Sequence, residues 1–286
     1  MEKYLQNIMF SKSDSFKELR ENGYIYVDKT KYIELLENNN DKSVHMLRPR
    51  RFGKSLFTST LSCYYDITEK DNFDLIFKNT YIYEYPTKNR NAYYVLNLNF
   101  SELPDIQSKN FENIFTSIVI QSLNIFLDRY KIRINLVQSD SAASILSNFF
   151  VDVKPLLNNK KVYVIIDEYD HFANGLLSFN FQEFTSVTNS NGFVRAFYEE
   201  IICNRKYCIK SILTGVSSIT LDSLTSGFNI RTNLSLDPRF NEMFGFTIDE
   251  MMSLISMVPS IQDKQTILQE KKQYYRNSYK ANNSEI

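Results

Sequence analysis

Hydrophobic and polar residues alternate along the chain between short continuous apolar runs and longer segments with apolar residues three or four positions apart. Continuous runs are typical of strands buried on both faces of a sheet, and they predict strands at residues 43–47, 93–100, 162–166 and 208–213. The helical spacing predicts helices that end near Glu37 or span residues 54–65, 110–129, 144–151, 193–202, 248–257 and 265–275. Strands separated by helices predict an α/β fold, with a parallel sheet covered by helices on both faces.

Polar residues at the predicted helix starts support this pattern. Asp28 and Thr30 can cap the helix that ends near Glu37. Thr247, with Glu250 three positions later, forms a capping-box pattern at the start of the helix at 248–257. Ligands of parallel sheets bind beyond the carboxyl ends of the strands. We therefore look for a functional site among the polar residues that follow each predicted strand.

The segment after the first predicted strand, Arg48–Ser55, has the sequence RPRRFGKS and leads directly into a helix. Its last three residues match the end of the phosphate-binding (Walker A) pattern GxxxxGK[ST], although Arg48 replaces the first glycine. Glycine lets the backbone approach phosphate oxygens, and free N–H groups at a helix start attract an anion. Lys54 would reach the β- and γ-phosphates, and the Ser55 hydroxyl would bind Mg²⁺. The tripeptide also arises by chance, so its position between a strand and a helix carries the prediction.

The third predicted strand ends in two adjacent carboxylates within the sequence VYVIIDEYD. Asp167 would hold Mg²⁺, directly or through water, and Glu168 would be the general base that polarises an attacking water. The alternative is an acidic turn that ends the strand in solvent. The GKS sequence after an earlier strand favours the first interpretation, because both motifs serve one site in phosphate-loop ATPases.

The fourth predicted strand leads into a small polar residue, Thr214, followed by Gly215. In phosphate-loop ATPases with an extra strand, a residue at this position senses the γ-phosphate through a hydrogen bond, which Thr214 could do. A strand-terminating turn explains the same residues equally well, and the sequence leaves both interpretations open.

Composition excludes several other classes of protein. Of the 286 residues, 43% are hydrophobic and 23% charged, which is typical of a globular domain rather than a disordered chain. Lys+Arg and Asp+Glu each total 33, so no net field attracts nucleic acid or an anionic membrane. The first residues predict no signal peptide, and the most apolar stretch, 117–127, is too short to span a bilayer. With three cysteines, no CxxC pair and two histidines, we expect neither a disulfide framework nor a zinc site.

Together, the motifs resemble those of the bacterial AAA-ATPase-like proteins, a branch of the phosphate-loop ATPases related to the AAA and STAND groups. Residues 48–55 match the family's RPRRFGKS loop at every position, including the absent first glycine. Residues 166–170 match its IDEYD, and residues 214–216 match its TGV. Further similar segments follow the family's order at residues 26–30 (YVDKT), 94–101, 226–229 and 244–247 (FGFT).

The resemblance implies a three-layer P-loop NTPase domain at residues 1–247, followed by a partial helical lid and polar tail at residues 248–286. It implies ATP and Mg²⁺ as cofactors and gives each motif residue a role. The residues concerned are Lys54, Glu168 and Thr214 in catalysis, Ser55 and Asp167 at the metal, and Arg50, Arg51, Phe52, Gly53, Lys54 and Ser55 at the nucleotide. Arg50 and Arg51 either neutralise phosphate charge or form structural ion pairs with Asp170 or Glu168.

Residues outside these motifs also keep two interpretations. Arg231 and Arg239 are candidates for an arginine finger that acts in trans, or else solvated loop residues. Residues 28–30 either line the base side of the nucleotide or cap a helix. Residues 277–279 resemble only part of the family's YNGY-like lid segment, and no PD-(D/E)XK motif is present. Nuclease activity, which many members carry in a further domain, is therefore not implied.

The sequence thus predicts a cytoplasmic, Mg²⁺-dependent ATPase that binds and hydrolyses ATP to drive a conformational change. One alternative is a nucleotide-gated interaction module, because a missing lid would leave the site open to water. Another is a truncated protein without useful catalysis, because the sequence stops within the segment that resembles the family's lid motif. The expected partners are a nucleotide and an unidentified protein or a second copy. Nucleic acid is a weaker possibility, because the one basic cluster, residues 48–54, already belongs to the phosphate loop. A membrane is not expected, because the chain has neither a long enough apolar stretch nor a net charge.

Overall fold

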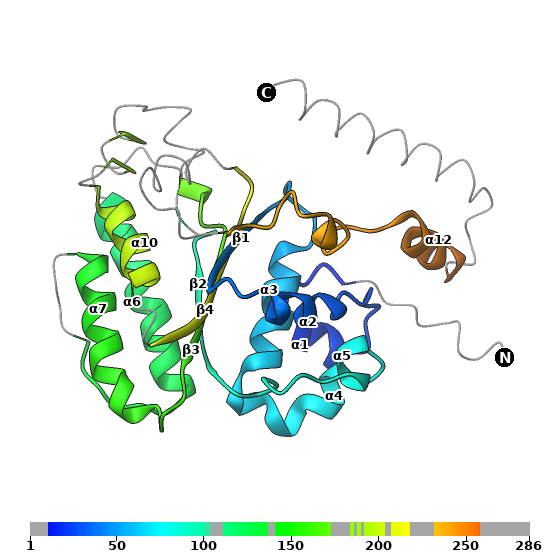
Figure 1. The fold of residues 1–286 in the computed structure, drawn as a ribbon, viewed down its shortest axis with the longest axis horizontal. Helices are drawn as coiled ribbons and strands as arrows, with labels where there is room; N and C mark the ends of the chain where they lie inside the picture. Colours follow the sequence, from blue (N-terminus) through cyan, green and yellow to red (C-terminus); the bar gives the residue numbers. More distant parts are fainter. Residues whose placement is uncertain are drawn as a thin grey trace.

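The computed structural model describes residues 11–101, 103, 111–136, 141–172, 184–185, 188–189, 192–203, 207–217 and 232–257. In this part of the chain, a five-stranded parallel sheet lies between two groups of helices (Figure 1). Its strands are β1 (Ser43–Leu47), β2 (Tyr94–Asn99), β3 (Val162–Asp167), β4 (Cys208–Gly215) and β5 (Thr232–Asn233). The predicted α/β fold, with a parallel sheet covered on both faces, is confirmed.

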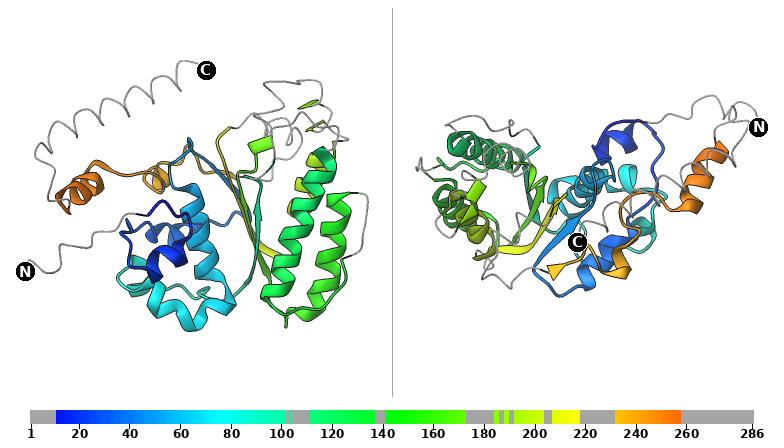
Figure 2. Two further views of the ribbon diagram at one scale, coloured as in Figure 1. Left: turned by 180° about the vertical axis from the view of Figure 1, so that it is seen from behind. Right: turned by 90° about the horizontal axis from the view of Figure 1, so that it is seen from above.

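The helices divide between the two faces of the sheet (Figures 1 and 2). One face is covered by α6 (Phe111–Arg129), α7 (Ala142–Val153) and α10 (Phe193–Cys203). The other is covered by α1 (Phe16–Glu21), α2 (Lys31–Asn38), α3 (Lys54–Tyr65), α4 (Phe73–Phe77) and α5 (Tyr81–Glu84). Three 3₁₀ helices, η2 (Ile67–Asn72), η3 (Lys154–Leu156) and η4 (Pro238–Phe240), and the helix α12 (Ile248–Met257) complete the described elements. None of these described helices is both long and apolar enough to cross a membrane.

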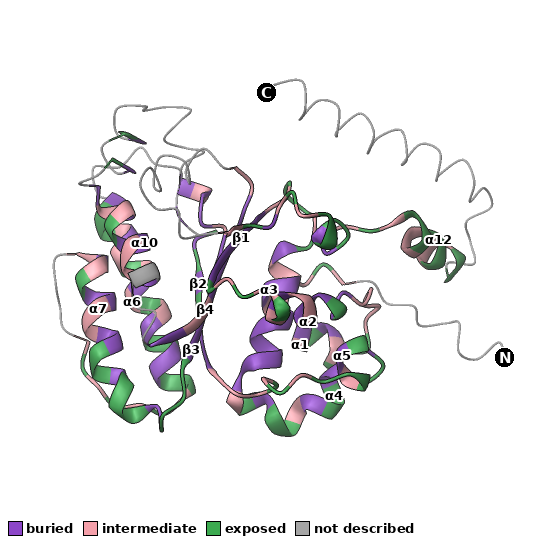
Figure 3. Cartoon of the chain, in the orientation of Figure 1, coloured by how far each residue is buried: buried purple, intermediate pink, exposed green. Residues whose placement is uncertain are grey.

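Each strand contributes side chains to two hydrophobic cores, because successive strand residues point to opposite faces. In β2 and β3, for example, Leu96 and Val164 pack with α6, α7 and α10, whereas Val95 and Ile165 pack with α3. Figure 3 shows the buried sheet and the buried inner sides of the helices, whose outer sides are exposed. Burial on both faces explains why the strands read as continuous apolar runs rather than as alternating ones.

The strand order β2-β3-β4-β1-β5 places β4 between β1 and β3. The chain leaves β1 through α3, crosses to β2 at the far edge of the sheet, and later returns to fill the gap beside β1. Because all pairings are parallel, the carboxyl ends of the strands meet at one edge. The polar residues that follow β1, β3 and β4 are therefore neighbours in space.

Several predicted boundaries hold, and the differences affect the site. The bounds of β1, α3 and α12 are those predicted. β3 and β4 run on to Asp167 and Gly215, so Asp167 and Thr214 are strand residues held by the sheet rather than by a loop. The short helices α1, α4 and α5 were not predicted, because four to six residues are too few to show a helical period. The predicted helix at 265–275 lies outside the described residues.

The predicted side-chain cap of α2 by Thr30 is wrong. Thr30 is the N-cap residue, but its side chain makes no hydrogen bond to that helix. Its Oγ1 instead accepts a hydrogen bond from Ile82 N at 3.1 Å, and Asp28 Oδ2 accepts one from Tyr81 N at 2.6 Å. The two polar side chains therefore satisfy free N–H groups at the start of α5, a short helix that the sequence pattern did not predict.

Asp66, a buried carboxylate, follows the C-terminal end of α3 and binds side chains at the end of α6. Asp66 is fully buried, and its Oδ2 lies 2.7 Å from Arg129 Nε and accepts a hydrogen bond from the Tyr130 hydroxyl at 2.8 Å. Its Oδ1 accepts hydrogen bonds from Thr68 N and Oγ1. A buried charge of this kind needs such partners, and here they join α3 to the end of α6.

Leu61 provides a test of the core between α3 and the sheet. It is 0% exposed, so we expect Leu61→Ala to lower the free energy of unfolding by about 2–5 kcal/mol, through lost burial and a residual cavity. Leu75→Ala is the matched control, because Leu75 is 61% exposed and the change should stay within about 0.5 kcal/mol. Urea denaturation followed by circular dichroism measures both. Equal losses in the two variants would contradict the described packing.

Candidate functional site

The segments that follow β1, β3 and β4 are joined by backbone hydrogen bonds at the carboxyl edge of the sheet. Leu47 pairs with Gly215 in the β1–β4 register, and Arg48 N donates to Gly215 O at 3.1 Å. On the other side of β4, Tyr169 N donates to Thr214 O at 3.1 Å. The phosphate-loop segment, the DEYD segment and the TGV segment, which are far apart in the sequence, thus form one site.

The loop before α3 has the backbone conformation of an anion-binding turn. Gly53 has φ +82°, in the left-handed region that favours glycine, and Arg51 has φ 66°. α3 begins at Lys54, so the N–H groups of its first turn have no acceptor within the helix. Free N–H groups of this kind and the helix dipole favour an anion. That the loop binds phosphate stays a prediction.

Arg48, which replaces the first glycine of the loop pattern, binds backbone groups at the end of β1 and in the segment after β5. Its Nη1 donates to Leu47 O and to Ser235 O, both at 2.8 Å. Ser235 Oγ in turn accepts a hydrogen bond from Leu47 N at 2.8 Å. The arginine thus joins the end of β1 to the segment after β5, a role that no signal in the sequence identified.

Lys54 lies at the centre of the loop, with its ammonium almost completely buried. Its Nζ donates to Arg48 O at 3.1 Å and to Pro49 O at 3.3 Å, and lies 3.5 Å from Glu168 Oε1. A buried ammonium needs such acceptors. The structure therefore places the predicted phosphate-binding lysine directly beside the predicted general base.

The predicted metal ligand and the predicted sensor contact each other. Asp167 is buried, and its Oδ1 accepts hydrogen bonds from the Thr214 hydroxyl and, at 3.1 Å, from Glu168 N. Glu168 has φ 54°, an uncommon conformation for a residue with a Cβ and one that is concentrated at functional sites. This turn directs the Glu168 side chain toward Lys54.

Ser55 and Asp167 both line a polar cleft of about 630 Å³ beside α3. A serine hydroxyl and one carboxylate fit a Mg²⁺ ion, because this ion commonly keeps several waters and binds nucleotide phosphates with only one or two protein carboxylates. Among the described residues, no group of three or more histidines, cysteines and carboxylates could hold a metal by itself. The two side chains thus suit an ion that is shared with a phosphate rather than a metal site made only of protein ligands.

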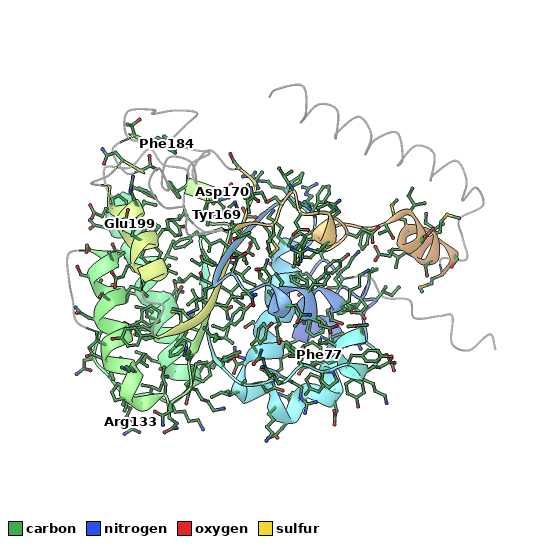
Figure 4. All side chains as sticks on the ribbon, viewed as in Figure 1. Phe77, Arg133, Tyr169, Asp170, Phe184 and Glu199 are labelled. Atoms are coloured by element: carbon green, nitrogen blue, oxygen red, sulfur yellow. The ribbon has the colours of Figure 1, made fainter. Side chains whose placement is uncertain are left out.

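Tyr169 and Asp170, the second half of the DEYD sequence, hold the segment after β4. Asp170 Oδ2 accepts hydrogen bonds from the N–H groups of Val216, at 2.8 Å, and of Ser217, and the Tyr169 hydroxyl donates to Ser217 O. Burial raises the pKa of the Asp170 carboxyl, and the two backbone donors oppose that rise. Figure 4 shows both side chains together at the end of the central sheet. The sequence motif contained these residues, but only the structure shows what they contact.

The arginines of the loop do not form the predicted alternative ion pairs. Arg50 and Arg51 are exposed, and among the described residues neither forms a salt bridge with Asp170 or Glu168. The partner of Glu168 is Lys54. The two arginines therefore stay available at the loop surface.

The two candidates for an arginine finger have different outcomes. Arg239 Nη2 lies 2.6 Å from Asp237 Oδ2, and its side chain is 61% exposed. Arg231 lies outside the described residues. The suggestion that either one acts in trans stays a prediction.

A second, less polar cavity of about 240 Å³ borders Gly53 on the other side of the loop. It is lined by residues from both ends of the described chain, including Tyr26, Val27, Phe52, Phe244 and Leu254. Of residues 28–30, only Lys29 lines it. The role of residues 28–30 at the base side of a nucleotide stays a prediction.

Lys29 connects this cavity to α12. Its Nζ donates to both carboxylate oxygens of Glu250, each at 2.7 Å, and to Glu242 O at 2.8 Å. The predicted capping box is confirmed, because Glu250 Oε2 accepts from Thr247 N at 2.7 Å and Thr247 Oγ1 accepts from Glu250 N at 3.2 Å. One carboxylate thus caps α12 and holds it beside the cavity.

Comparison with known proteins agrees with these motifs. The family described as "Predicted AAA-ATPase" (AAA-ATPase-like) matches residues 13–225, which include the loop, the DEYD segment and the TGV segment. A curated relative, "Uncharacterized protein in vnfD 5'region" of Azotobacter chroococcum mcd 1, is 27% identical over 243 residues. The match covers 82% of this chain and 42% of that protein, so the chain spans less than half the length of this relative.

Glu250→Gln tests the contact between Lys29 and α12. Burial alone would raise the pKa of Glu250, but the hydrogen bonds from Lys29 and Thr247 lower it below its usual value. A lowered carboxyl pKa stabilises the fold above the usual value of about 4.3, and that contribution is lost as the pH falls through the folded-state pKa. We expect the variant to lose about 1–3 kcal/mol at neutral pH and the difference from wild type to shrink below about pH 4.

Urea denaturation across this pH range measures the effect. Glu242→Gln is the matched control, because Glu242 is exposed and only its backbone oxygen contacts Lys29. Equal losses in both variants, or a difference between Glu250→Gln and wild type that does not change with pH, would contradict the contact.

Proposed function

The chain belongs to the family of predicted AAA-ATPases, and we propose that it binds ATP with Mg²⁺ and hydrolyses it at the carboxyl ends of β1, β3 and β4. One observation carries the proposal: Lys54 lies 3.5 Å from Glu168, beside Asp167 and Thr214, which contact each other. A cation for phosphate, a base, a metal ligand and a hydroxyl donor are thus gathered around one helix start. This is the set of groups that phosphoryl transfer to water requires.

The loop would bind the phosphates through its backbone and through Lys54. The N–H groups at the start of α3 point toward the space beside Gly53, where the left-handed turn leaves room for a close approach. Lys54 would exchange the carbonyl oxygens of Arg48 and Pro49 for phosphate oxygens. The exposed Arg50 and Arg51 would add positive charge at the loop surface.

Ser55 and Asp167 would hold Mg²⁺, which when bound neutralises negative charge on the phosphates. Glu168 would take a proton from the water that attacks the terminal phosphate. Thr214 would turn its single hydroxyl hydrogen from Asp167, to which it donates in this structure, toward a terminal phosphate oxygen. The parallel pairing of β3 and β4 places Asp167 and Thr214, the residues at or near their ends, side by side.

The base of the nucleotide would lie in the less polar cavity beside Gly53. Aromatic and aliphatic side chains line it, and pockets of this composition bind planar apolar groups. Leu254 of α12 lines this cavity, and Lys29, which also lines it, binds Glu250 of α12. A nucleotide base in the cavity would therefore affect the position of α12. We propose that this is how nucleotide turnover drives a conformational change, with a protein partner or a second copy as the receiver.

Lys54→Ala and Glu168→Gln together test the proposal. We expect Lys54→Ala to abolish turnover and weaken nucleotide binding, because it removes the cation that the phosphates need. Glu168→Gln should keep binding of Mg·ATP and lose turnover by about 10²–10⁴-fold, because only the proton acceptor is removed. Isothermal titration and phosphate-release assays measure the two properties separately. Lys70→Ala is the matched control, because Lys70 is exposed in η2, which follows the end of α3 that lies away from the loop.

The outcomes separate the alternatives. Absence of binding at millimolar Mg·ATP would overturn the proposal. Tight binding without turnover above the Lys54→Ala level would instead identify a nucleotide-gated interaction module.

A further inference from the structure

The turns after β3 and β4 interlock through side chains that the proposed chemistry does not use. Asp170 is fully buried, and its Oδ2 accepts hydrogen bonds from backbone N–H groups two and three residues after Thr214. Tyr169 adds a third bond, from its hydroxyl to the carbonyl oxygen of Ser217. Tyr169 and Asp170 in the turn after β3 thus bind two N–H groups and one carbonyl group in the turn after β4.

Gly215 shows how closely the two turns approach. A Cβ added at this position would lie 2.3 Å from Cε1 of Tyr169 and 2.6 Å from Oδ1 of Asp170. Both distances are far inside van der Waals contact. Neither neighbour can move away easily, because the tyrosine ring is fully buried and the other carboxylate oxygen of Asp170, Oδ2, is held by two hydrogen bonds. The φ of Gly215 does not lie in the left-handed region, so the backbone conformation does not require glycine here. The close contact does require it.

The turn after β3 is also held by a contact with α10. The Tyr198 hydroxyl of α10 donates to Tyr169 O at 2.9 Å, and both rings are buried. The turn that carries Glu168 therefore cannot shift without breaking contacts to α10 and to β4 together. It is a rigid base from which Asp170 can hold the end of β4.

We propose that Asp170 is a positioning residue, whose carboxylate holds the N–H groups of Val216 and Ser217 and so fixes Thr214 against Asp167 in the ATPase site. This inference rests on the proposed function, and it assigns to Asp170 no contact with nucleotide or water. A carboxylate acceptor suits the task, because hydrogen bonds to a charged group are about twice as strong as neutral ones. Misplacement of a reacting or sensing group by about 1 Å can cost on the order of 10²-fold in rate.

The test is a double-mutant cycle of Asp170→Ala and Thr214→Ala in the full chain. We expect Asp170→Ala to lower kcat by on the order of 10²-fold, while affinity for ADP, which has no terminal phosphate for Thr214, stays within about threefold. Because both variants remove one function, the double variant should be no slower than Thr214→Ala alone. Asp170→Asn keeps an acceptor oxygen without the charge, so its kcat should lie between those of wild type and Asp170→Ala.

Asp66→Ala is the matched control for the loss of a buried carboxylate. Asp66 is equally buried and also accepts several hydrogen bonds, but it lies at the other end of α3. It should lower the melting temperature without lowering the kcat of the folded protein. A kcat near wild type in Asp170→Ala, additive losses in the double variant, or an ADP affinity that falls as far as kcat would each overturn the inference while leaving the proposed function intact.

Amide hydrogen exchange gives a readout that does not depend on turnover. The N–H groups of Val216 and Ser217 should exchange faster in Asp170→Ala, or in Asp170→Asn if the alanine variant does not fold, and not in Asp66→Ala. Unchanged exchange would overturn the inference. A wild type that neither binds nor hydrolyses Mg·ATP, with exchange responding as expected, would overturn the proposed function and with it the assignment of Asp170 to an ATPase site.

Discussion

The insertion of β4 between β1 and β3 is the constraint on which the rest of the structure depends. Parallel pairing on both sides of β4 fixes the distance and register between the strand that leads into the phosphate loop and the strand that ends in Asp167. Backbone hydrogen bonds then continue past the strand ends, from Arg48 to Gly215 and from Tyr169 to Thr214. Backbone pairing therefore brings the polar side chains around Lys54 to one edge of the sheet.

Much of the fold and part of the site could be predicted from sequence, for identifiable reasons. Strands buried on both faces leave continuous apolar runs, so the bounds of β1 and the central residues of β3 follow from the hydrophobic pattern alone. Glycine, lysine and serine before a helix, and adjacent carboxylates after a strand, carry local signals that need no knowledge of topology. Family resemblance then supplied Thr214, whose side chain alone is compatible with an ordinary turn.

The rest depends on contacts between segments that lie far apart in the chain. Arg48 bonds to Ser235, and Asp170 bonds to Val216 and Ser217, so neither role has a local signal. Thr30 shows the opposite failure. It carries a local capping signal for α2, yet its Oγ1 accepts a hydrogen bond from Ile82 N in α5, 52 residues further along the chain. Asp28 serves both helices, because its Oδ1 accepts from Thr30 N at the start of α2 and its Oδ2 accepts from Tyr81 N in α5. Polar side chains near a helix start indicate that N–H groups will be satisfied, but the sequence does not say which helix supplies them.

The cavity beside Gly53 has walls from both ends of the described chain, with Tyr26 and Val27 on one side and Phe244 and Leu254 on the other. Any molecule that fills it contacts both walls at once and so acts as a reversible cross-link between segments separated by most of the chain. The chain entropy lost on closing a long loop grows only slowly with its length, so one small ligand can hold these ends together at modest entropic cost. A ligand that binds only the folded state adds a stability of RT ln(1 + [L]/Kd). The stability of the state in which the two walls are held together would therefore rise with the concentration of the ligand in the cell. The strength of the contact between α12 and the rest of the described chain would thus depend on the concentration of a cellular metabolite rather than on the covalent chain.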